Sequence, residues 1–169
     1  LSPDTPIKAT PVTFDEIRDS SDNPVDENTI TYDKTLTFIG TSERNTALNL
    51  RNDKIKFTDT TSDASGDWVK EFTLSDFKRY TIDAIEHEPP QNHSGSKTFV
   101  LATETPIINL VTGKDGEIKD GDTYDGDSVD IIGNAPPNVE VEAFNGETTT
   151  GKKALVDADG LFKLTLNEL

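Results

Sequence analysis

"LTFIGTSERNTALNL" runs from Leu36 to Leu50, and "VDIIGNAPPNVEVEA" runs from Val129 to Ala143. Each stretch holds an alternating apolar segment, a glycine, a polar corner and a second alternating segment. Alternation with a period of two is typical of a β-strand with one buried face. The chain therefore contains the same pair of strands twice, and this pattern decides the fold class.

The repetition extends over most of the sequence. Gly40 and Gly133 lie 93 residues apart. The same offset, without gaps, aligns Val25 with Ile118, Leu36 with Val129, Phe38 with Ile131, Leu48 with Val141 and Asn52 with Asn145. A period of this length exceeds the roughly 20 to 50 residues of solenoid repeats, so each copy is expected to be a domain. The sequence predicts a linker from a preceding segment at residues 1–10, a first domain at 11–104 and a second at 105–169.

Short alternating segments separated by turn residues fill the first copy. We expect strands at Thr13–Ile17, Lys34–Ile39, Thr46–Leu50, Ile55–Thr58, Val69–Leu74, Tyr80–Glu86 and Lys97–Leu101. Seven short strands in about 90 residues are typical of a two-sheet antiparallel sandwich. The alternation predicts a core of Leu36, Phe38, Leu48, Leu50, Phe72, Leu74, Ile82, Ala84, Phe99 and Leu101. The fold class is therefore all-β: two tandem antiparallel, Greek-key β-sandwiches.

Three local signals add detail to this topology. Trp68 starts a strand and has Phe162 as its counterpart, so we expect a core aromatic rather than an exposed binding platform. Tyr80 opens the next strand at a position typical of a tyrosine corner. Asn145-Gly146 is expected to form a two-residue hairpin turn in which both residues have positive φ.

The composition excludes several classes of function. The 169 residues carry a formal net charge of −16, which opposes binding to nucleic-acid phosphates. The chain has no cysteine, so it has neither a disulfide framework nor a thiol nucleophile. No apolar run approaches the roughly 18 residues of a membrane span.

Several motifs resemble a known family. "GTS" at Gly40–Ser42, "DASGDW" at Asp63–Trp68 and "YTIDA" at Tyr80–Ala84 occur in the order seen in bacterial immunoglobulin-like repeats, with Thr-Pro at the joints. These repeats occur in tandem in large, secreted, surface-attached proteins of the adhesin type. The resemblance implies an extracellular or cell-surface location and a structural role. "EHEPPQNHSGS" at 86–96 departs from the pattern, because the family has a short turn there.

That long tip is the first candidate site. Glu86, His87, Glu88 and His93 are the candidate binding residues, because loops on a rigid sandwich often carry recognition. The same imidazoles and carboxylates suit Zn or Ni, although their spacing matches no established site, and a solvated loop is the simpler interpretation. Asn92-His93-Ser94 has the form of a glycosylation sequon, which we interpret as accidental.

An acidic, glycine-rich segment is the second candidate site. "GKDGEIKDGDTYDGD" at 113–127 contains the candidate calcium ligands Asp115, Glu117, Asp120, Asp122, Asp125 and Asp127. Calcium prefers about six to eight oxygen ligands from such flexible, carboxylate-rich segments. The spacing is not that of an EF-hand loop, and solvated turns that blunt the sheet edges are the alternative.

The second copy is shorter than the first. By the repeat offset it lacks its last two strands, which would leave one inner face open. Closure by strand exchange between two copies of the chain is one hypothesis.

The leading functional hypothesis is a non-catalytic stalk that projects a terminal domain from a bacterial surface, with neighbouring immunoglobulin-like repeats as its partners. A module that binds a host glycan or protein through the 87–96 tip, and an accessory domain of a secreted hydrolase, are the alternatives.

Overall fold

The computed structural model describes residues 10–169, and every regular element in this range is a β-strand. Neighbouring strands pair antiparallel in both parts of the chain, so the predicted all-β class is confirmed. The described residues divide into two compact units, residues 10–75 with 80–99 and residues 100–169 with 76–79.

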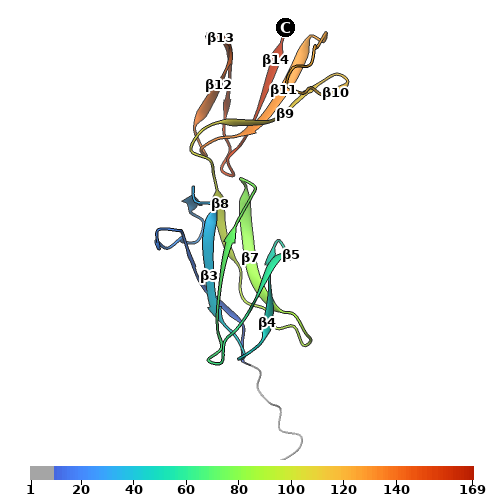
Figure 1. The fold of residues 1–169 in the computed structure, drawn as a ribbon. Coiled ribbons are helices and arrows are strands. Elements are labelled where there is room, and N and C mark those ends of the chain that lie inside the picture. Colours follow the sequence, from blue (N-terminus) through green and yellow to red (C-terminus); the bar gives the residue numbers. More distant parts are fainter. Residues whose placement is uncertain (1–9) are drawn as a thin grey trace, which may run out of the picture. The chain divides into compact units, whose positions relative to one another are not determined.

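The first unit is a sandwich of two sheets (Figure 1). Its strands are β1 (Thr13–Arg18), β2 (Ile30–Thr31), β3 (Thr35–Thr41), β4 (Ala47–Asn52), β5 (Ile55–Thr61), β6 (Asp67–Thr73), β7 (Arg79–Glu86) and β8 (Lys97–Leu101). One sheet has the order β1-β3-β6 and the other has the order β2-β8-β7-β4-β5. All seven strands expected in this part of the chain are present, and β2 is an eighth, very short strand.

Alternation places the predicted core residues between the two sheets. In β3, Leu36 and Phe38 are fully buried, while Thr37 between them is only half-buried. All the predicted core residues are buried except Phe72, which is half-buried. Its ring packs edge-on against Phe57 at 5.2 Å between centroids, so this aromatic pair covers the margin of the core.

Trp68 and Tyr80, the two aromatic residues discussed in the sequence analysis of the first unit, both lie in the core. Trp68 is 1% exposed, and its indole N–H donates a hydrogen bond to the Thr41 carbonyl oxygen at 3.2 Å. The prediction of a core aromatic is therefore confirmed. Tyr80 is also buried, and its ring stacks on Phe99 at 5.4 Å. The hydrogen bond expected for a tyrosine corner stays a prediction.

The second unit has a larger sheet and a separate hairpin (Figure 1). Its strands are β9 (Ile107–Gly113), β10 (Gly116–Glu117), β11 (Ser128–Asn134), β12 (Glu140–Asn145), β13 (Thr148–Leu155) and β14 (Leu161–Asn167). The sheet has the order β10-β9-β11-β14, and β12 pairs with β13. The core between them consists of Ala135, Val141, Ala143, Val156, Phe162 and Leu164.

One close contact is built in the same way in both units. A Cβ atom on Gly40 would lie 2.0 Å from the Thr13 carbonyl oxygen and 2.4 Å from the Trp68 ring. A Cβ atom on Gly133 would lie 2.1 Å from a carbonyl oxygen of β9 and 2.5 Å from the Phe162 ring. In each unit the glycine thus lets a neighbouring strand and an aromatic ring approach the backbone.

The turn that precedes each of these aromatic residues is also shared. The Asp63 carboxylate accepts the backbone N–H groups of Ser65 at 2.8 Å and Asp67 at 3.0 Å. The Asp157 carboxylate accepts those of Asp159 at 2.8 Å and Leu161 at 3.0 Å. Gly66 and Gly160 follow with φ of 85° and 80°, a conformation that glycine adopts without steric cost.

The β12–β13 hairpin corrects one expectation. Asn145 pairs with Thr148, so the two turn residues are Gly146 and Glu147 rather than Asn145 and Gly146. Gly146 has a φ of 61°, and glycine at the first central position is typical of a type II′ turn. The hairpin is where the sequence predicts it, but its turn lies one residue later.

Candidate functional site

The tip between β7 and β8 is held by backbone hydrogen bonds. The Glu86 N–H donates to the Asn92 carbonyl at 2.9 Å, and the Ser94 N–H donates to the Ala84 carbonyl at 2.8 Å. His93 also forms a β-bridge with Ile85. The segment after β7 therefore folds back along this strand, which gives the tip a defined path.

The four predicted binding residues of the tip have different environments. Glu86 is buried, and its carboxylate accepts the Asn92 backbone N–H at 3.2 Å. His87 and Glu88 are exposed, with 3.6 Å between the imidazole Nε2 and the carboxylate Oε1. His93 is exposed, and its Nδ1 lies 2.9 Å from the Ser94 carbonyl oxygen. Glu86 thus supports the backbone of the tip, whereas the other three side chains face solvent.

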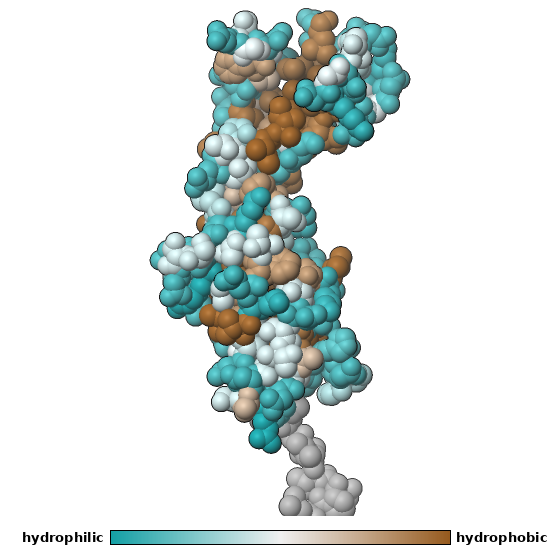
Figure 2. All heavy atoms as spheres, viewed as in Figure 1, coloured by the Kyte–Doolittle hydropathy of each residue, from teal (hydrophilic) through white to brown (hydrophobic). Residues whose placement is uncertain are grey.

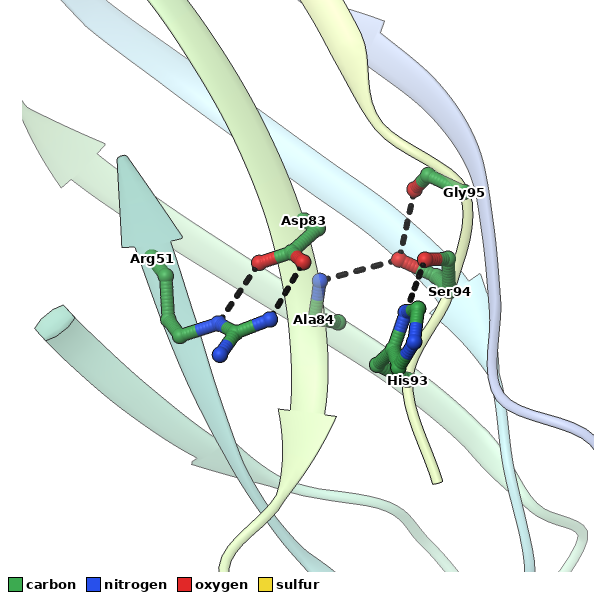
Figure 3. Close-up of polar contacts among 6 residues, drawn as sticks. All are labelled: Arg51, Asp83, Ala84, His93, Ser94 and Gly95. Atoms are coloured by element: carbon green, nitrogen blue, oxygen red, sulfur yellow. Dashed lines mark hydrogen bonds and ion pairs between the residues drawn. The ribbon is translucent and has the colours of Figure 1, made fainter. Parts of the chain in front are cut away.

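Ser94 is a buried hydroxyl beside a histidine, and it acts both as a hydrogen-bond donor and as an acceptor. Its Oγ accepts the Ala84 N–H at 2.9 Å and donates to the Gly95 carbonyl at 2.7 Å (Figure 3). The His93 ring contacts the Ser94 carbonyl oxygen and not its hydroxyl. A nucleophilic serine needs its proton directed at a base, so this pair has a structural geometry and not that of a nucleophile with its base.

A shallow, open pocket of about 440 Å³ lies next to the tip. It is lined by Asp53, Lys54, Thr81, Asp83, His93, Ser94, Gly95 and Ser96. Carboxylates, hydroxyls and an ammonium group surround it, so it offers several hydrogen-bond donors and acceptors at short range.

The wall of this pocket contains an ion pair that the sequence analysis did not identify. Arg51 donates two hydrogen bonds to Asp83, from Nε at 2.8 Å and from Nη2 at 2.5 Å (Figure 3). The two side chains are 18% and 15% exposed, and the hydrogen bond to Asp83 raises the pKa of Arg51. The two residues lie opposite each other on β4 and β7, so their pairing depends on a register that the sequence alone does not specify.

The acidic segment is organised around Tyr124. The Tyr124 hydroxyl donates to the Ser128 carbonyl at 2.7 Å and accepts the Lys114 N–H at 3.2 Å. The ring lies where Cβ atoms on Gly113 and Gly126 would be, so both glycines are needed for its close approach. The sequence analysis did not predict this role of Tyr124. The only signal for it in the sequence is a tyrosine placed among glycines and carboxylates.

The six predicted calcium ligands are all exposed. Asp125 forms an ion pair with Lys114 at 3.1 Å, and Asp122 accepts the Lys119 backbone N–H at 2.8 Å. Within residues 10–169, no three His, Cys, Asp or Glu side chains form a group suited to a metal ion. Calcium binding by this segment, like Zn or Ni binding by the tip, stays a prediction.

No protein-family model matches the chain, and no curated protein matches its sequence. Fold and local geometry therefore define the class: an all-β protein of antiparallel sheets with immunoglobulin-like sandwich architecture. Across the described residues, no helix has the length and apolarity to cross a membrane.

Proposed function

We propose that the chain is a non-catalytic stalk segment of a bacterial surface or secreted adhesin-like protein. In this role, two immunoglobulin-like sandwiches hold a terminal functional domain away from the surface. One observation carries the proposal: both units have a glycine, an aromatic ring packed over it and an aspartate turn just before the aromatic residue, in the same arrangement. Repeated packing of this kind supports a function that depends on number and length rather than on one unique site.

The charge of the chain supports the same role. A formal net charge of −16 in 169 residues makes neighbouring copies repel each other at short range. An array of acidic modules would therefore stay soluble and separated where many copies share one surface. The joint "TETP" at 103–106 also contains a proline, which restricts the backbone at this point.

The experiment is a distance measurement between spin labels in the two units. Because the chain has no cysteine, Glu71→Cys and Lys152→Cys place labels at two exposed positions without competing thiols. A stalk predicts one narrow distribution of distances. The matched control is Glu71→Cys with Ser96→Cys, both in the first unit. The width of the distance distribution between these two labels gives the value expected for a rigid pair. A between-unit distribution much broader than this control contradicts a stiff stalk.

The polar pocket favours recognition by the tip as a second candidate function. The pocket lining suits a glycan, because its carboxylates and hydroxyls can hydrogen-bond to sugar hydroxyl groups. Binding to immobilised glycans would be compared for the natural chain, His93→Ala and Thr81→Val. Loss of binding in both variants supports recognition at this pocket. Equal binding in all three places the recognition elsewhere and contradicts this candidate.

A further inference from the structure

A second pocket of the first unit lies where the tip meets the corner between β3 and β4. It has a volume of about 520 Å³ and shares no lining residue with the pocket described above. Its lining includes the carboxylates of Glu43, Glu86 and Glu88, and it includes no lysine, arginine or histidine. Figure 2 shows that the visible surface of the first unit is mainly hydrophilic, with apolar residues in small, separate patches. We call this cavity the acidic pocket.

Glu86 is the buried carboxylate of the acidic pocket. It is 7% exposed, and its Oε2 accepts the backbone N–H of Asn92 at 3.2 Å and the side-chain amide of Asn92 at 3.4 Å. Within residues 10–169, no hydrogen-bond donor reaches the other oxygen, Oε1, and no cationic side chain pairs with the carboxylate. Burial of a carboxylate without a cationic partner is costly, so Oε1 is placed to accept a donor from the pocket.

The other two carboxylates lie at the rim. Glu43 and Glu88 are exposed, and their contacts are a hydrogen bond from the Thr10 hydroxyl at 2.7 Å and the His87 imidazole at 3.6 Å. The repeat offset of 93 residues places Pro136 at the position of Glu43 in the second copy. A carboxylate at this corner is therefore not a requirement of the sandwich.

The arrangement of the carboxylates favours an organic cation over a metal ion. Among residues 10–169, no three His, Cys, Asp or Glu side chains are close enough to hold one ion, whereas Ca²⁺ needs about six to eight oxygens at once. A guanidinium group presents N–H donors in several directions, so it can serve carboxylates that lie apart. Ala47, Pro89 and Pro90 also line the pocket and offer aliphatic surface to a methylene stem.

We propose that the acidic pocket binds an arginine side chain of a partner polypeptide. The guanidinium group donates to Glu86 Oε1, and the methylene stem packs against Pro89 and Pro90. The pocket is larger than a guanidinium group alone requires, so the peptide on either side of the arginine also has room. Carboxylates at the rim favour the approach of a basic partner. This site does not depend on the stalk role, because it lies within one unit.

Three end-blocked peptides test the charge of the ligand. Gly-Arg-Gly is titrated into the isotope-labelled chain, and binding is followed by NMR through the side-chain amide of Asn92, which contacts Glu86. Citrulline has nearly the shape of arginine without its charge, so Gly-citrulline-Gly should bind about tenfold more weakly. Gly-Lys-Gly should bind about two- to fivefold more weakly, because an ammonium group lacks the planar fork. Equal binding of the arginine and citrulline peptides overturns the proposal.

Two variants locate the site. Glu86→Gln keeps an oxygen acceptor for Asn92 but removes the charge, so Gly-Arg-Gly should bind about tenfold more weakly. Glu43→Gln changes an exposed side chain at the corner and should weaken binding about two- to fivefold. If Glu86→Gln does not fold, Glu43→Gln carries the test, and unchanged affinity in that variant overturns the proposal.

Glu71→Gln is the matched control for these variants. It removes the same charge from an exposed position on β6 outside the acidic pocket. Its affinity for Gly-Arg-Gly should equal that of the natural chain. An equal loss of affinity in Glu71→Gln and Glu86→Gln would mean that the net charge of −16, rather than the pocket, attracts the peptide, and this overturns the proposal.

Two further probes distinguish the source of the cation. Propylguanidine carries the same charged group without a peptide, and it should bind more weakly than Gly-Arg-Gly. Equal affinity assigns the pocket to a free small-molecule cation and overturns the role of a partner polypeptide. Millimolar Ca²⁺ should leave the Asn92 side-chain resonances unchanged. If it shifts them and displaces the peptide, the pocket is a metal site and the proposal is wrong.

Discussion

At the residue scale, the contact of Gly40 with the Trp68 ring has the clearest consequence for stability. Gly40→Ala places a methyl group 2.0 Å from a backbone oxygen and 2.4 Å from a buried ring, and neither can move freely. Overpacking of a close-packed core costs about 1 to 3 kcal/mol, and this site belongs at the upper end of that range. We expect a loss of about 2 to 3 kcal/mol in the free energy of unfolding, measured by urea denaturation with Trp68 fluorescence as the probe.

Gly95→Ala is the matched control for this substitution. Gly95 is exposed, and a Cβ atom there would meet nothing within 4 Å. Its variant should unfold at the same urea concentration as the natural chain, within about 0.5 kcal/mol. Equal losses from both variants would contradict the assignment of the loss to the close contact at Gly40, because Gly→Ala by itself restricts the unfolded chain and does not destabilise the fold.

The ion pair of Arg51 and Asp83 should contribute more than an ordinary surface pair. It is bidentate and its side chains are less than one-fifth exposed. Hydrogen bonds to charged groups contribute about 1.5 to 3 kcal/mol, so Asp83→Asn should lower the free energy of unfolding by about 1.5 kcal/mol. Arg51→Lys should lower it almost as much, because lysine lacks the planar fork. A double-mutant cycle with Arg51→Gln measures the coupling, and a value near zero contradicts this account.

Asp33 should make the first unit sensitive to acid. The hydroxyl of Ser20 donates to its carboxylate and holds the pKa of Asp33 below its ordinary value of 3.8, with help from the Ser20 and Thr35 N–H groups. Because the pKa is lower in the folded state, the stabilisation is fully present above pH 3.8. It is lost as the pH falls through the lower, folded-state pKa.

Asp33→Asn tests this dependence. The variant should have a lower Tm than the natural chain at pH 7, and the difference should shrink as the pH falls below 3.8. Thermal unfolding at a series of pH values gives both results. A difference that stays constant into acid would mean that the carboxylate's charge does not contribute.

At the scale of elements, the β4–β5 hairpin has an unfavourable turn. Both of its turn residues, Asp53 and Lys54, have positive φ, at 48° and 68°. A type I′ turn of this kind prefers Asn-Gly or Asp-Gly, because a lysine in the left-handed region costs about 1 to 2 kcal/mol. Glycine removes this cost but loses more backbone entropy on folding. Lys54→Gly should therefore raise the free energy of unfolding by about 0.5 to 1 kcal/mol.

Lys54→Ala separates the backbone effect from loss of the side chain. Alanine has the same restriction at positive φ as lysine, so this variant should leave stability unchanged within about 0.5 kcal/mol. Urea denaturation of both variants provides the measurement. A gain with alanine equal to that with glycine would contradict the role assigned to φ.

Most strands could be predicted from the sequence because alternation is a local signal. Leu36 and Phe38 alternate with polar residues, and so do Leu48 and Leu50, which indicates both the strand and its buried face. The strand β2 was missed because two residues are too few for a period. The turn at Gly146 was placed one residue early, because the order Asn-Gly suits one turn type and the strand register selected another.

The candidate site could be predicted only in part, because its contacts depend on three-dimensional register. The tip at 86–96 is visible as a polar insertion, but the burial of Glu86 is not, since charged residues are rarely buried. Arg51 and Asp83 are 32 residues apart in sequence, and only strand pairing brings them together. The Tyr124 contacts with Gly113 and Gly126 also depend on how a loop folds back on itself.

At the scale of the whole molecule, the two units differ in how completely their cores are covered. Phe38, Leu48, Leu50, Ile82 and Phe99 of the first unit are all 0% exposed. The second unit has a smaller core, centred on Val156, with an apolar groove open beside it. Since buried apolar area is the main source of stability, the second unit should be the less stable of the two.

We therefore expect two transitions on heating, with the second unit unfolding at least about 5 °C below the first. Trp68 is the only tryptophan and lies in the first unit, so its fluorescence should follow the later transition, while circular dichroism follows both. Gly133→Ala should lower the earlier transition alone, and Gly40→Ala the later one alone, because each close contact lies within its own unit. A single transition with coincident probes, shifted by either substitution, would mean that the units unfold together and that the open groove costs the second unit no stability of its own.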